Sequence, residues 1–508
     1  MNGLNHSAAL IALATFLVAI STRADVTPHA LFTPHGVLQR EMPIPVWGKA
    51  DPGENVTVVL DGASVSAAAN AAGDWLVRLP ARPAGGPFML TLSGKNRIEL
   101  NDVWVGEVWL ASGQSNMERQ LGLRNGQQPL ENWEQEVASA NYPQIRHFTV
   151  ARTPSDTTLT VTAGKWDVCS PATVAQFTAV GYYFARDLRR KLGVAVGVIH
   201  SSWGGTPAET WMRRDLLTSQ FPEVITAQEK AVAAYDIALP KFKAEEPALL
   251  KAWEEAVAAA KVAGKAAPAK PAPPRNPSTT QNRPASLYQG MITPLQPYAI
   301  RGVLWYQGES NNGRTEAYRT LFPALIRDWR AQWGQGDFPF LFVQIAPFRG
   351  ITPELRDAQL HTWHTTPNTA MVVTTDVGDA DDIHPTRKEP VGARLALAAR
   401  ALAYGEALDY SGPRFQAATI TGGKVVLSFD HLGGGLVAKD GPLRGFTISA
   451  DGKTFVPAEA VIAGDTVEVS AVTVTAPVAV RYGWTNVPDV NLYNTAGLPA
   501  SPFRSDTP

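Results

Sequence analysis

The chain has little cysteine and almost no net charge. One of its 508 residues is a cysteine, Cys169, so no disulfide can form within the chain. The 45 basic and 46 acidic residues leave a formal net charge of -1. This balance gives no electrostatic reason to expect nucleic acid or an anionic membrane as a partner. No redox or metal motif surrounds Cys169 in "KWDVCSP", and we expect it to be a small buried apolar residue.

Long apolar runs are missing after the first 24 residues. The run "AALIALATFLVAI" at positions 8–20 is short for a bilayer span and is followed by "TRA". This pattern predicts a signal peptide cleaved after Ala24, and therefore a secreted or periplasmic protein that does not stay in the membrane. The alternatives are a membrane anchor and a buried N-terminal helix.

Motifs for metals and cofactors are also missing. The stretch "DVGDADD" lacks the glycine and the glutamate that a calcium loop requires at its sixth and twelfth positions. No spacing of histidines and cysteines matches a zinc site, and no phosphate loop or dinucleotide fingerprint stands at a usable position. We therefore expect neither a metal nor a cofactor.

The patterns that are present divide the chain into regions. Residues 25–101 show short alternating strands with Asp-Gly and Gly-Asp turns, which predicts a β-sandwich. Residues 102–404 alternate apolar strands with helical stretches, which predicts βαβ units around a mostly parallel sheet. Strand patterns return in residues 405–508, as a second β-rich module that could pack with the first. An Ala-rich and then Pro-rich insertion at about 224–285 predicts a helix followed by an extended linker.

Unusual polar clusters follow four of the apolar strands. They are "GQSNM", "WGGTPAETW", "GESNN" and "DADDIHPTRK". Sites in open parallel sheets form beyond the carboxyl ends of strands. Four such clusters are more than folding requires, so we expect them to meet in one site.

These blocks resemble the sialate O-acetylesterase group of the SGNH hydrolases. "VLQREMPIPVWGKADPG" near the N-terminus and "NLYNTAGLPASPFR" near the C-terminus also resemble family segments. The resemblance implies an α/β, flavodoxin-like three-layer domain with accessory β-sandwich modules. It also implies a serine carboxylic ester hydrolase that needs no cofactor.

The same resemblance assigns the catalytic residues. Ser115 in "GQSNM" corresponds to the nucleophile, and the Asp-x-x-His block corresponds to Asp381 and His384. A serine needs a base to remove its proton, and the base needs a carboxylate to orient its ring. Asp382 is the alternative to Asp381. Locally, Ser115 and Glu118 also fit a helix capping box.

The oxyanion hole is expected to combine backbone and side-chain donors. The backbone N–H of Ser115 and that of Gly204 or Gly205 are the main-chain candidates. Gln307 is preferred over Glu309 as the side-chain donor, because an ionised glutamate cannot donate a hydrogen bond. Asn311 is the fallback, because it could align with the asparagine of other SGNH enzymes.

Supporting roles are expected for residues beside these groups, namely Gln114, Asn116 and Glu309. Glu309 could organise the site by hydrogen bonding to a loop or near the nucleophile. Thr206, Pro207 and Glu209 fit an N-cap, a first-turn proline and a capping-box glutamate, which would fix the Gly204–Gly205 turn.

The expected substrate is an O-acetylated carbohydrate. The acceptor could be plant hemicellulose, such as xyloglucan or xylan oligosaccharides, or sialic acid. Trp203 and Trp211 could stack on sugars, and Arg119, Arg314 and Arg387 are candidates for binding a sialate carboxylate. The rival hypotheses are a non-catalytic carbohydrate-binding protein and a lipase or thioesterase.

Overall fold

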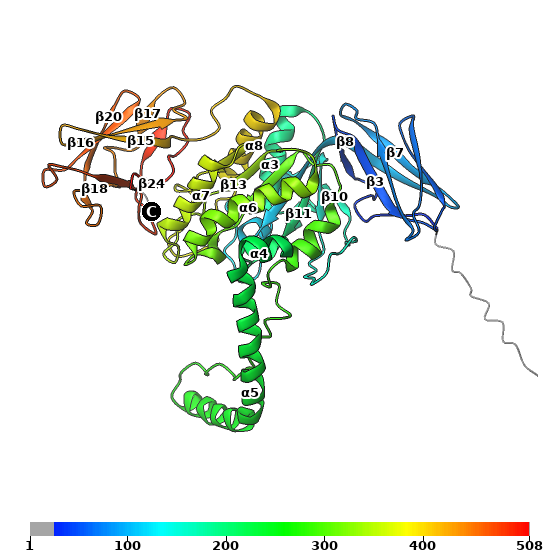
Figure 1. The fold of residues 1–508 in the computed structure, drawn as a ribbon, viewed down its shortest axis with the longest axis horizontal. Helices are drawn as coiled ribbons and strands as arrows, with labels where there is room; N and C mark the ends of the chain where they lie inside the picture. The colour runs from blue at the N-terminus through cyan, green and yellow to red at the C-terminus, as the bar shows by residue number, and fades with distance from the viewer. Residues whose placement is uncertain (1–24, 507–508) are drawn as a thin grey trace, which may run out of the picture.

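A computed structural model describes residues 25–506. The predicted signal peptide lies outside the described residues. The chain forms a central α/β domain with a β-module on each side and a long helical arm (Figure 1). The two β-modules lie on opposite flanks of the central domain, so the suggestion that they pack together is wrong.

The central sheet is built on buried, apolar strands. Its path runs β10-β9-β11-β8-β12-β13-β14. The neighbours from β9 to β14 pair in parallel, and β10 is antiparallel at the edge. With its attached strands the whole sheet has 11 strands and is mixed, and only its central part is parallel. The strands are β8 (Arg97–Gly113), β9 (Tyr142–Thr149), β10 (Trp166–Cys169), β11 (Val196–Ser202), β12 (Gly302–Tyr306), β13 (Phe340–Val343) and β14 (Thr369–Val372).

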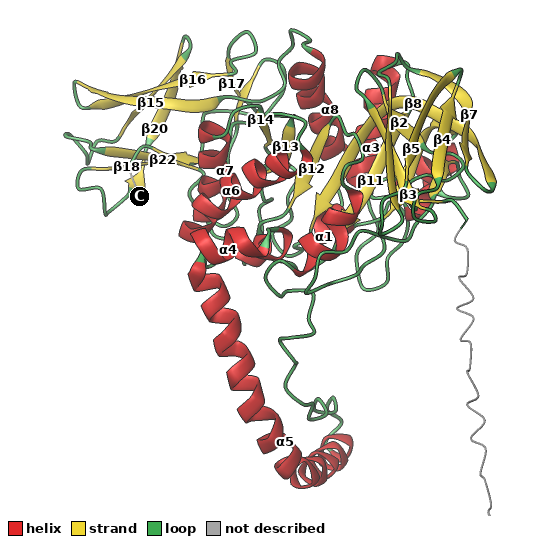
Figure 2. Ribbon diagram, turned by 45° about the vertical axis from the view of Figure 1, so that its right-hand side comes forward, coloured by secondary structure: helices red, strands yellow, loops and turns green. Residues whose placement is uncertain are grey.

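Helices cover both faces of this sheet. α3 (Ala179–Leu192) packs against α8 (Glu389–Tyr404), and α6 (Thr315–Trp333) packs against α7 (Pro353–Thr365). Figure 2 shows the helices flanking the strands.

The N-terminal module shares a strand with the central domain. β8 pairs with β7 in its first half and with β11 and β12 in its second half. The predicted boundary between residues 101 and 102 therefore falls inside one strand. The other strands of the module are β1 (Thr27–Pro28), β2 (Val37–Gln39), β3 (Ile44–Lys49), β4 (Asn55–Leu60), β5 (Ala63–Ala68), β6 (Asp74–Leu79) and β7 (Gly85–Ser93).

The C-terminal module docks on the α7 side of the central domain. Gln344 Nε2 donates to Ser501 Oγ at 2.8 Å, and Arg504 pairs with Asp357 of α7 at 3.2 Å. The module's strands are β15 (Arg414–Thr421), β16 (Lys424–Asp430), β17 (Leu436–Ala438), β18 (Phe446–Ser449), β19 (Val456–Pro457), β20 (Glu459–Ala463), β21 (Thr466–Ser470), β22 (Ala479–Tyr482), β23 (Leu492–Asn494) and β24 (Phe503–Arg504).

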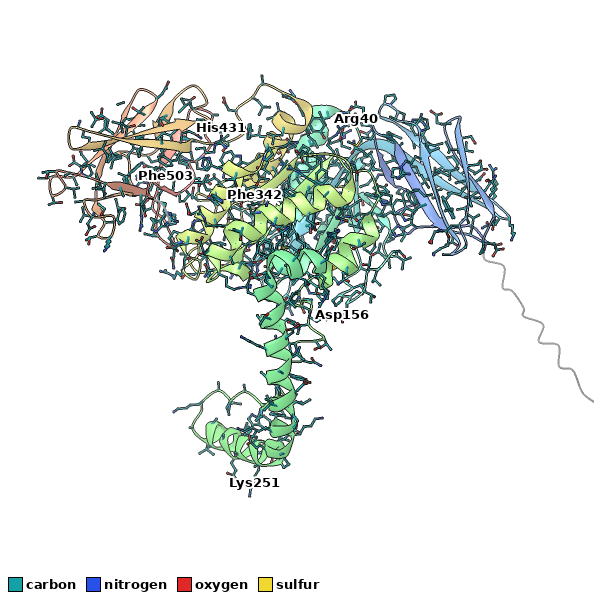
Figure 3. The ribbon with its side chains drawn as sticks, in the orientation of Figure 1. Arg40, Asp156, Lys251, Phe342, His431 and Phe503 are labelled. Carbon is teal, nitrogen blue, oxygen red and sulfur yellow. The ribbon has the colours of Figure 1, made fainter. Side chains whose placement is uncertain are left out.

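The predicted insertion is an arm that leaves the body of the molecule. After the short α4 (Arg214–Gln220), α5 (Pro222–Val262) extends outward, and a segment without helix or strand returns. Pro240 and Pro247 lie inside α5, whose far part bends (Figure 2). Lys251 marks the distant part of the arm in Figure 3. The prediction of a helix followed by an extended linker is confirmed.

Two further expectations concern single features. Cys169 is buried, and burial raises the pKa of its thiol to about 12, so it is an inert apolar residue as predicted. Within residues 25–506, none of the helices combines the length and the apolar character that crossing a bilayer requires.

Candidate active site

Three strands end at the same level and carry three of the predicted blocks. Gly113 of β8 is paired with Ser202 of β11 and with Tyr306 of β12. The residues after each strand therefore emerge side by side. Ser115 begins the short helix α1 (Ser115–Glu118) directly beyond β8. The sequence-based expectation that these blocks meet at one edge of the sheet is confirmed.

The fourth block comes from the loop between β14 and α8. His384 in this loop has its Nε2 atom 2.9 Å from the Oγ atom of Ser115, although 269 positions separate the two residues. Burial lowers the pKa of His384, the charge of Lys388 lowers it further, and Asp382 opposes them. His384 is therefore neutral at pH 7 and able to accept the proton of Ser115.

Asp382, and not Asp381, lies beside the histidine. Asp382 Oδ1 is 3.8 Å from His384 Nδ1 and accepts the backbone N–H of His384 at 2.8 Å. The side chain of Asp381 is 75% exposed and pairs with Arg349 at 2.6 Å. The choice of Asp381 is wrong because Asp379 Oδ1 accepts the N–H groups of Asp381 and Asp382, which folds a tight turn and sends the two carboxylates in different directions.

The two amides expected at the oxyanion hole are engaged elsewhere. Gln307 Nε2 donates to Asn311 Oδ1 at 2.7 Å and to the Thr206 carbonyl at 3.3 Å. Asn311 Nδ2 donates to Glu209 at 3.0 Å. Both side chains are fully buried. The assignment of Gln307 and Asn311 as oxyanion donors is wrong because their amide N–H groups are used to fix the loops below the cleft.

The glycine turn after β11 approaches the nucleophile closely. A Cβ atom on Gly204 would lie 3.2 Å from the Ser115 Cβ atom and 2.7 Å from Glu118 Oε2. The Gly204 N–H donates to the Glu118 carboxylate, so it is not free for a substrate. Gly205 has a φ of 72° and open space around it. The backbone N–H groups of Ser115 and Gly205 donate to no acceptor among residues 25–506.

The predicted capping boxes did not form. α1 has Gln114 at its N-cap, with no side-chain cap, and Glu118 turns toward Gly204 instead. The helix expected after Pro207 is a single 3-10 turn, Ala208–Trp211, also without a side-chain cap. Its Glu209 pairs with Arg314 at 2.6 Å as well as with Asn311. The carboxylates of Glu118 and Glu209 bond to donors from other loops instead of capping their own helices, because both are buried among these donors.

The three supporting residues form bonds between the blocks. Gln114 Oε1 accepts the Ser310 N–H at 3.2 Å. Asn116 Nδ2 donates to Glu309 Oε1 at 2.6 Å, and Asn116 Oδ1 accepts from Lys388 Nζ at 2.5 Å. Glu309 therefore hydrogen-bonds the residue next to the nucleophile, which is one of the two roles expected for it. Lys388 was missed because nothing in "PTRKEP" indicates that this lysine is buried.

A cleft of about 510 Å³ opens over Ser115 and His384. Arg124 and Arg152 line this cleft although the motifs did not indicate them, whereas Trp203 was expected as a stacking residue. Trp203 is half-buried with the Arg152 guanidinium 5.6 Å from its ring. Glu118 pairs with both arginines, at 2.8 Å from Arg124. The lining residues are Gln114, Ser115, Glu118, Arg124, Gln127, Arg152, Trp203, Gly204, Gly205, Glu309, Ser310, Ile383 and His384.

The other predicted sugar contacts are structural. Trp211 is fully buried, and its Nε1 donates to Thr206 Oγ1 at 3.0 Å. Arg119 is buried and donates to three backbone carbonyls. Arg314 pairs with Glu209, and Arg387 pairs with Glu131 at 3.4 Å. Their nearness to the motifs in sequence did not place them in the cleft.

Comparison with known proteins agrees with this geometry. The family model "Carbohydrate esterase, sialic acid-specific acetylesterase" matches residues 105–241 and 278–401. The rat sialate O-acetylesterase is 32% identical over 418 residues, which is 72% of each chain. The human sialate O-acetylesterase is 29% identical over 521 residues, 90% of this chain and 88% of that one.

A solved structure extends the likeness to the whole fold. The crystal structure of a carbohydrate acetylesterase from Xanthomonas citri has a TM-score of 0.80 and 39% identity, and the match covers 95% of this chain and 99% of that chain. The two matched parts of the family model leave out residues 242–277, which lie in the arm. This chain is a carboxylic ester hydrolase that belongs to the sialic acid-specific acetylesterase family of carbohydrate esterases.

Proposed function

We propose that this protein is a secreted serine esterase that removes acetyl groups from O-acetylated carbohydrate. The observation that carries the proposal is the 2.9 Å contact between Ser115 Oγ and His384 Nε2 at the floor of an open cleft. A nucleophile within reach of a neutral imidazole is the arrangement that acyl transfer requires.

The reaction has two steps. Ser115 Oγ attacks the acetyl carbonyl while His384 Nε2 takes the hydroxyl proton. His384 then gives this proton to the sugar oxygen, the ester C–O bond breaks, and acetyl-Ser115 remains. Water attacks the acetyl group with His384 again as base, which releases acetate and restores Ser115. Asp382 stabilises the imidazolium form through its carboxylate near Nδ1.

The oxyanion of each tetrahedral intermediate needs donors close to the nucleophile. We assign this role to the N–H groups of Ser115 and Gly205, which have no acceptor within the described part of the chain. The Gly204 N–H holds Glu118 and thereby fixes the turn that presents Gly205. One such donor contributes roughly 3 kcal/mol to transition-state stabilisation.

The natural substrate is a neutral acetylated sugar of plant hemicellulose, such as a xylan or xyloglucan oligosaccharide. Arg124 and Arg152 are the two cations lining the cleft, and both already pair with Glu118. A sialate carboxylate would have to displace that buried partner. A neutral sugar needs no such exchange and can stack on half-buried Trp203.

Replacing Ser115 tests the esterase itself. With p-nitrophenyl acetate, we expect Ser115→Ala to lower kcat by at least about 10³-fold, because the nucleophile is removed. Full activity of this variant would refute the assignment of Ser115. Faster turnover of long-chain esters than of acetate by the unmodified protein would instead support a lipase.

A panel of natural esters tests the substrate. Acetate release should be faster from acetylated xylan or xyloglucan oligosaccharides than from O-acetylated sialosides. The opposite order would show that Arg124 or Arg152 exchanges Glu118 for the sialate carboxylate, and would overturn the choice of a neutral sugar.

A further inference from the structure

A buried ammonium group lies directly behind the nucleophile. Lys388 is 2% exposed and stands four positions after His384. Its Nζ atom is 2.5 Å from Asn116 Oδ1 and 5.4 Å from the centre of the Tyr306 ring. Lysine is almost never fully buried without a partner, because removing its charge from water is costly. The burial of Lys388 therefore indicates that its ammonium group has a role at this position.

Asn116 transmits the position of Lys388 to three parts of the site. It follows Ser115 in α1. Its Nδ2 atom donates to Glu309 Oε1 at 2.6 Å and to the Ile383 carbonyl at 3.0 Å. Ile383 immediately precedes His384. The amide of Asn116 therefore links the nucleophile helix to the histidine loop, and the ammonium determines which way that amide faces, because only its oxygen can accept from Lys388.

Charge complements this geometry. Glu309 is buried, and its Oε2 atom has no hydrogen-bond partner among the described residues. Glu309 and Lys388 bind opposite ends of the Asn116 amide, so the negative charge of the carboxylate offsets the positive charge of the ammonium. Burial lowers the pKa of Lys388 to about 7, while Glu309 and Asp382 raise it and Arg119 lowers it. The charged groups that face His384 are Lys388, Asp382, Arg124 and Arg119.

We propose that Lys388 is a positioning residue of this esterase. Acting through Asn116, it fixes the loop that carries His384 against Ser115, and its charge disfavours protonation of the His384 ring. The inference rests on the proposed function, because the effect is read through the hydrolysis of an ester. Lys388 itself does not contact Ser115 or the substrate.

The variant Lys388→Met removes the charge and keeps most of the side-chain length. With p-nitrophenyl acetate, we expect kcat to fall about 10- to 100-fold with little change in KM, because His384 is less well placed. The acid limb of kcat/KM should move to higher pH, because His384 loses a cationic neighbour. Lys388→Arg should retain the acid limb of the unmodified protein.

The matched control is Arg387→Met. Arg387 precedes Lys388, but its side chain is half exposed and pairs with Glu131. Removing this solvent-exposed cation should leave both kcat and the acid limb in place. A shift as large as that of Lys388→Met would overturn the proposal, because any nearby cation would then act in the same way.

The double variant Glu309→Gln with Lys388→Met separates positioning from folding. It removes both buried charges, so it should melt at a higher temperature than Lys388→Met alone, or fold where that variant does not. We expect it to keep the shifted acid limb and the lowered kcat. Recovery of the unmodified kcat and acid limb would overturn the proposal, because Lys388 would then only neutralise Glu309.

The outcomes distinguish this inference from the proposed function. An unmodified protein without esterase activity, or an active Ser115→Ala variant, would refute the proposed function. An active protein whose Lys388→Met variant has the same acid limb and kcat would refute the role of Lys388 alone.

Discussion

Asp381 and Asp382 are neighbours in the chain, but only Asp382 lies near the catalytic histidine. The turn held by Asp379 separates the two carboxylates. A carboxylate beside Nδ1 stabilises the protonated ring that forms during the reaction. The backbone N–H of His384 donates to Asp382 Oδ1 at 2.8 Å, which holds this carboxylate beside the ring.

The two aspartates make a matched pair for mutation. Asp382→Asn should lower kcat by about 10²- to 10⁴-fold, because an amide does not stabilise the imidazolium. Asp381→Asn should change kcat little, because Asp381 contacts Arg349 at the surface. Steady-state kinetics with p-nitrophenyl acetate would check both, and the reverse order would restore Asp381 as the orienting residue.

At the residue scale, the sequence predicted the reacting atoms better than their partners. Ser115 and His384 were assigned by the family resemblance, and their side chains meet as expected. Gln307, Asn311 and Asp381 were misplaced because a motif gives the residue type but not the direction of the side chain. Arg124, Arg152 and Lys388 were missed because their burial and pairing depend on segments far away in the chain.

The elements around the site act as one unit. Glu118 of α1 joins the turn after β11, and Gln114 joins the turn after β12. The α/β character of the central domain followed from the alternation of strand and helix patterns, whereas the order of the strands in the sheet did not. The junction between the N-terminal module and the central domain could not be predicted, because β8 continues through the change in composition that indicated a boundary.

The turn after β11 has no room for a side chain at Gly204. In Gly204→Ala, the new Cβ atom would meet Glu118 Oε2 at 2.7 Å and crowd Ser115. We expect kcat to fall at least about tenfold, because a displacement of about 1 Å at a catalytic group costs that much or more. Kinetics together with thermal melting would check this, and an unchanged kcat would contradict the close packing.

The arm is expected to be separable from the hydrolase. No side chain of α5 that the structure describes is buried, and Gln228 lies 3.0 Å from the Pro277 carbonyl, so the two sides of the arm run together near its base. Replacing residues 230–275 with a short glycine–serine linker should leave the melting temperature and the turnover of p-nitrophenyl acetate unchanged. Loss of either would show that the arm supports the core.

The whole molecule carries several buried neutral histidines. Burial lowers the pKa of His29 to about 4 and that of His200 to about 3, and it lowers the pKa of His147 well below its usual value, with a further contribution from His200. In the unfolded chain these groups titrate near 6.5. Between these pH values the unfolded state binds protons that the folded state does not.

This difference predicts acid sensitivity. The stability from these histidines is fully present above pH 6.5 and is lost as the pH falls from about 6.5 toward 4, by roughly 1.4 kcal/mol per pH unit for each group. Melting temperatures measured from pH 7.5 to 4.5 should fall accordingly. His29→Gln should make that decline less steep, and an identical slope would show that His29 does not contribute.

The strand β8 has a mechanical consequence. Its 17 residues run from the N-terminal module to the base of the loop that carries Ser115, and the strand is hydrogen-bonded to neighbours along both halves. The two bodies are joined by one continuous strand, so a motion of the N-terminal module relative to the nucleophile would have to bend β8 or break its pairing. Force applied to that module would be transmitted through β8 directly to the catalytic sheet. Removing the module together with all of β8 would remove a central strand of that sheet.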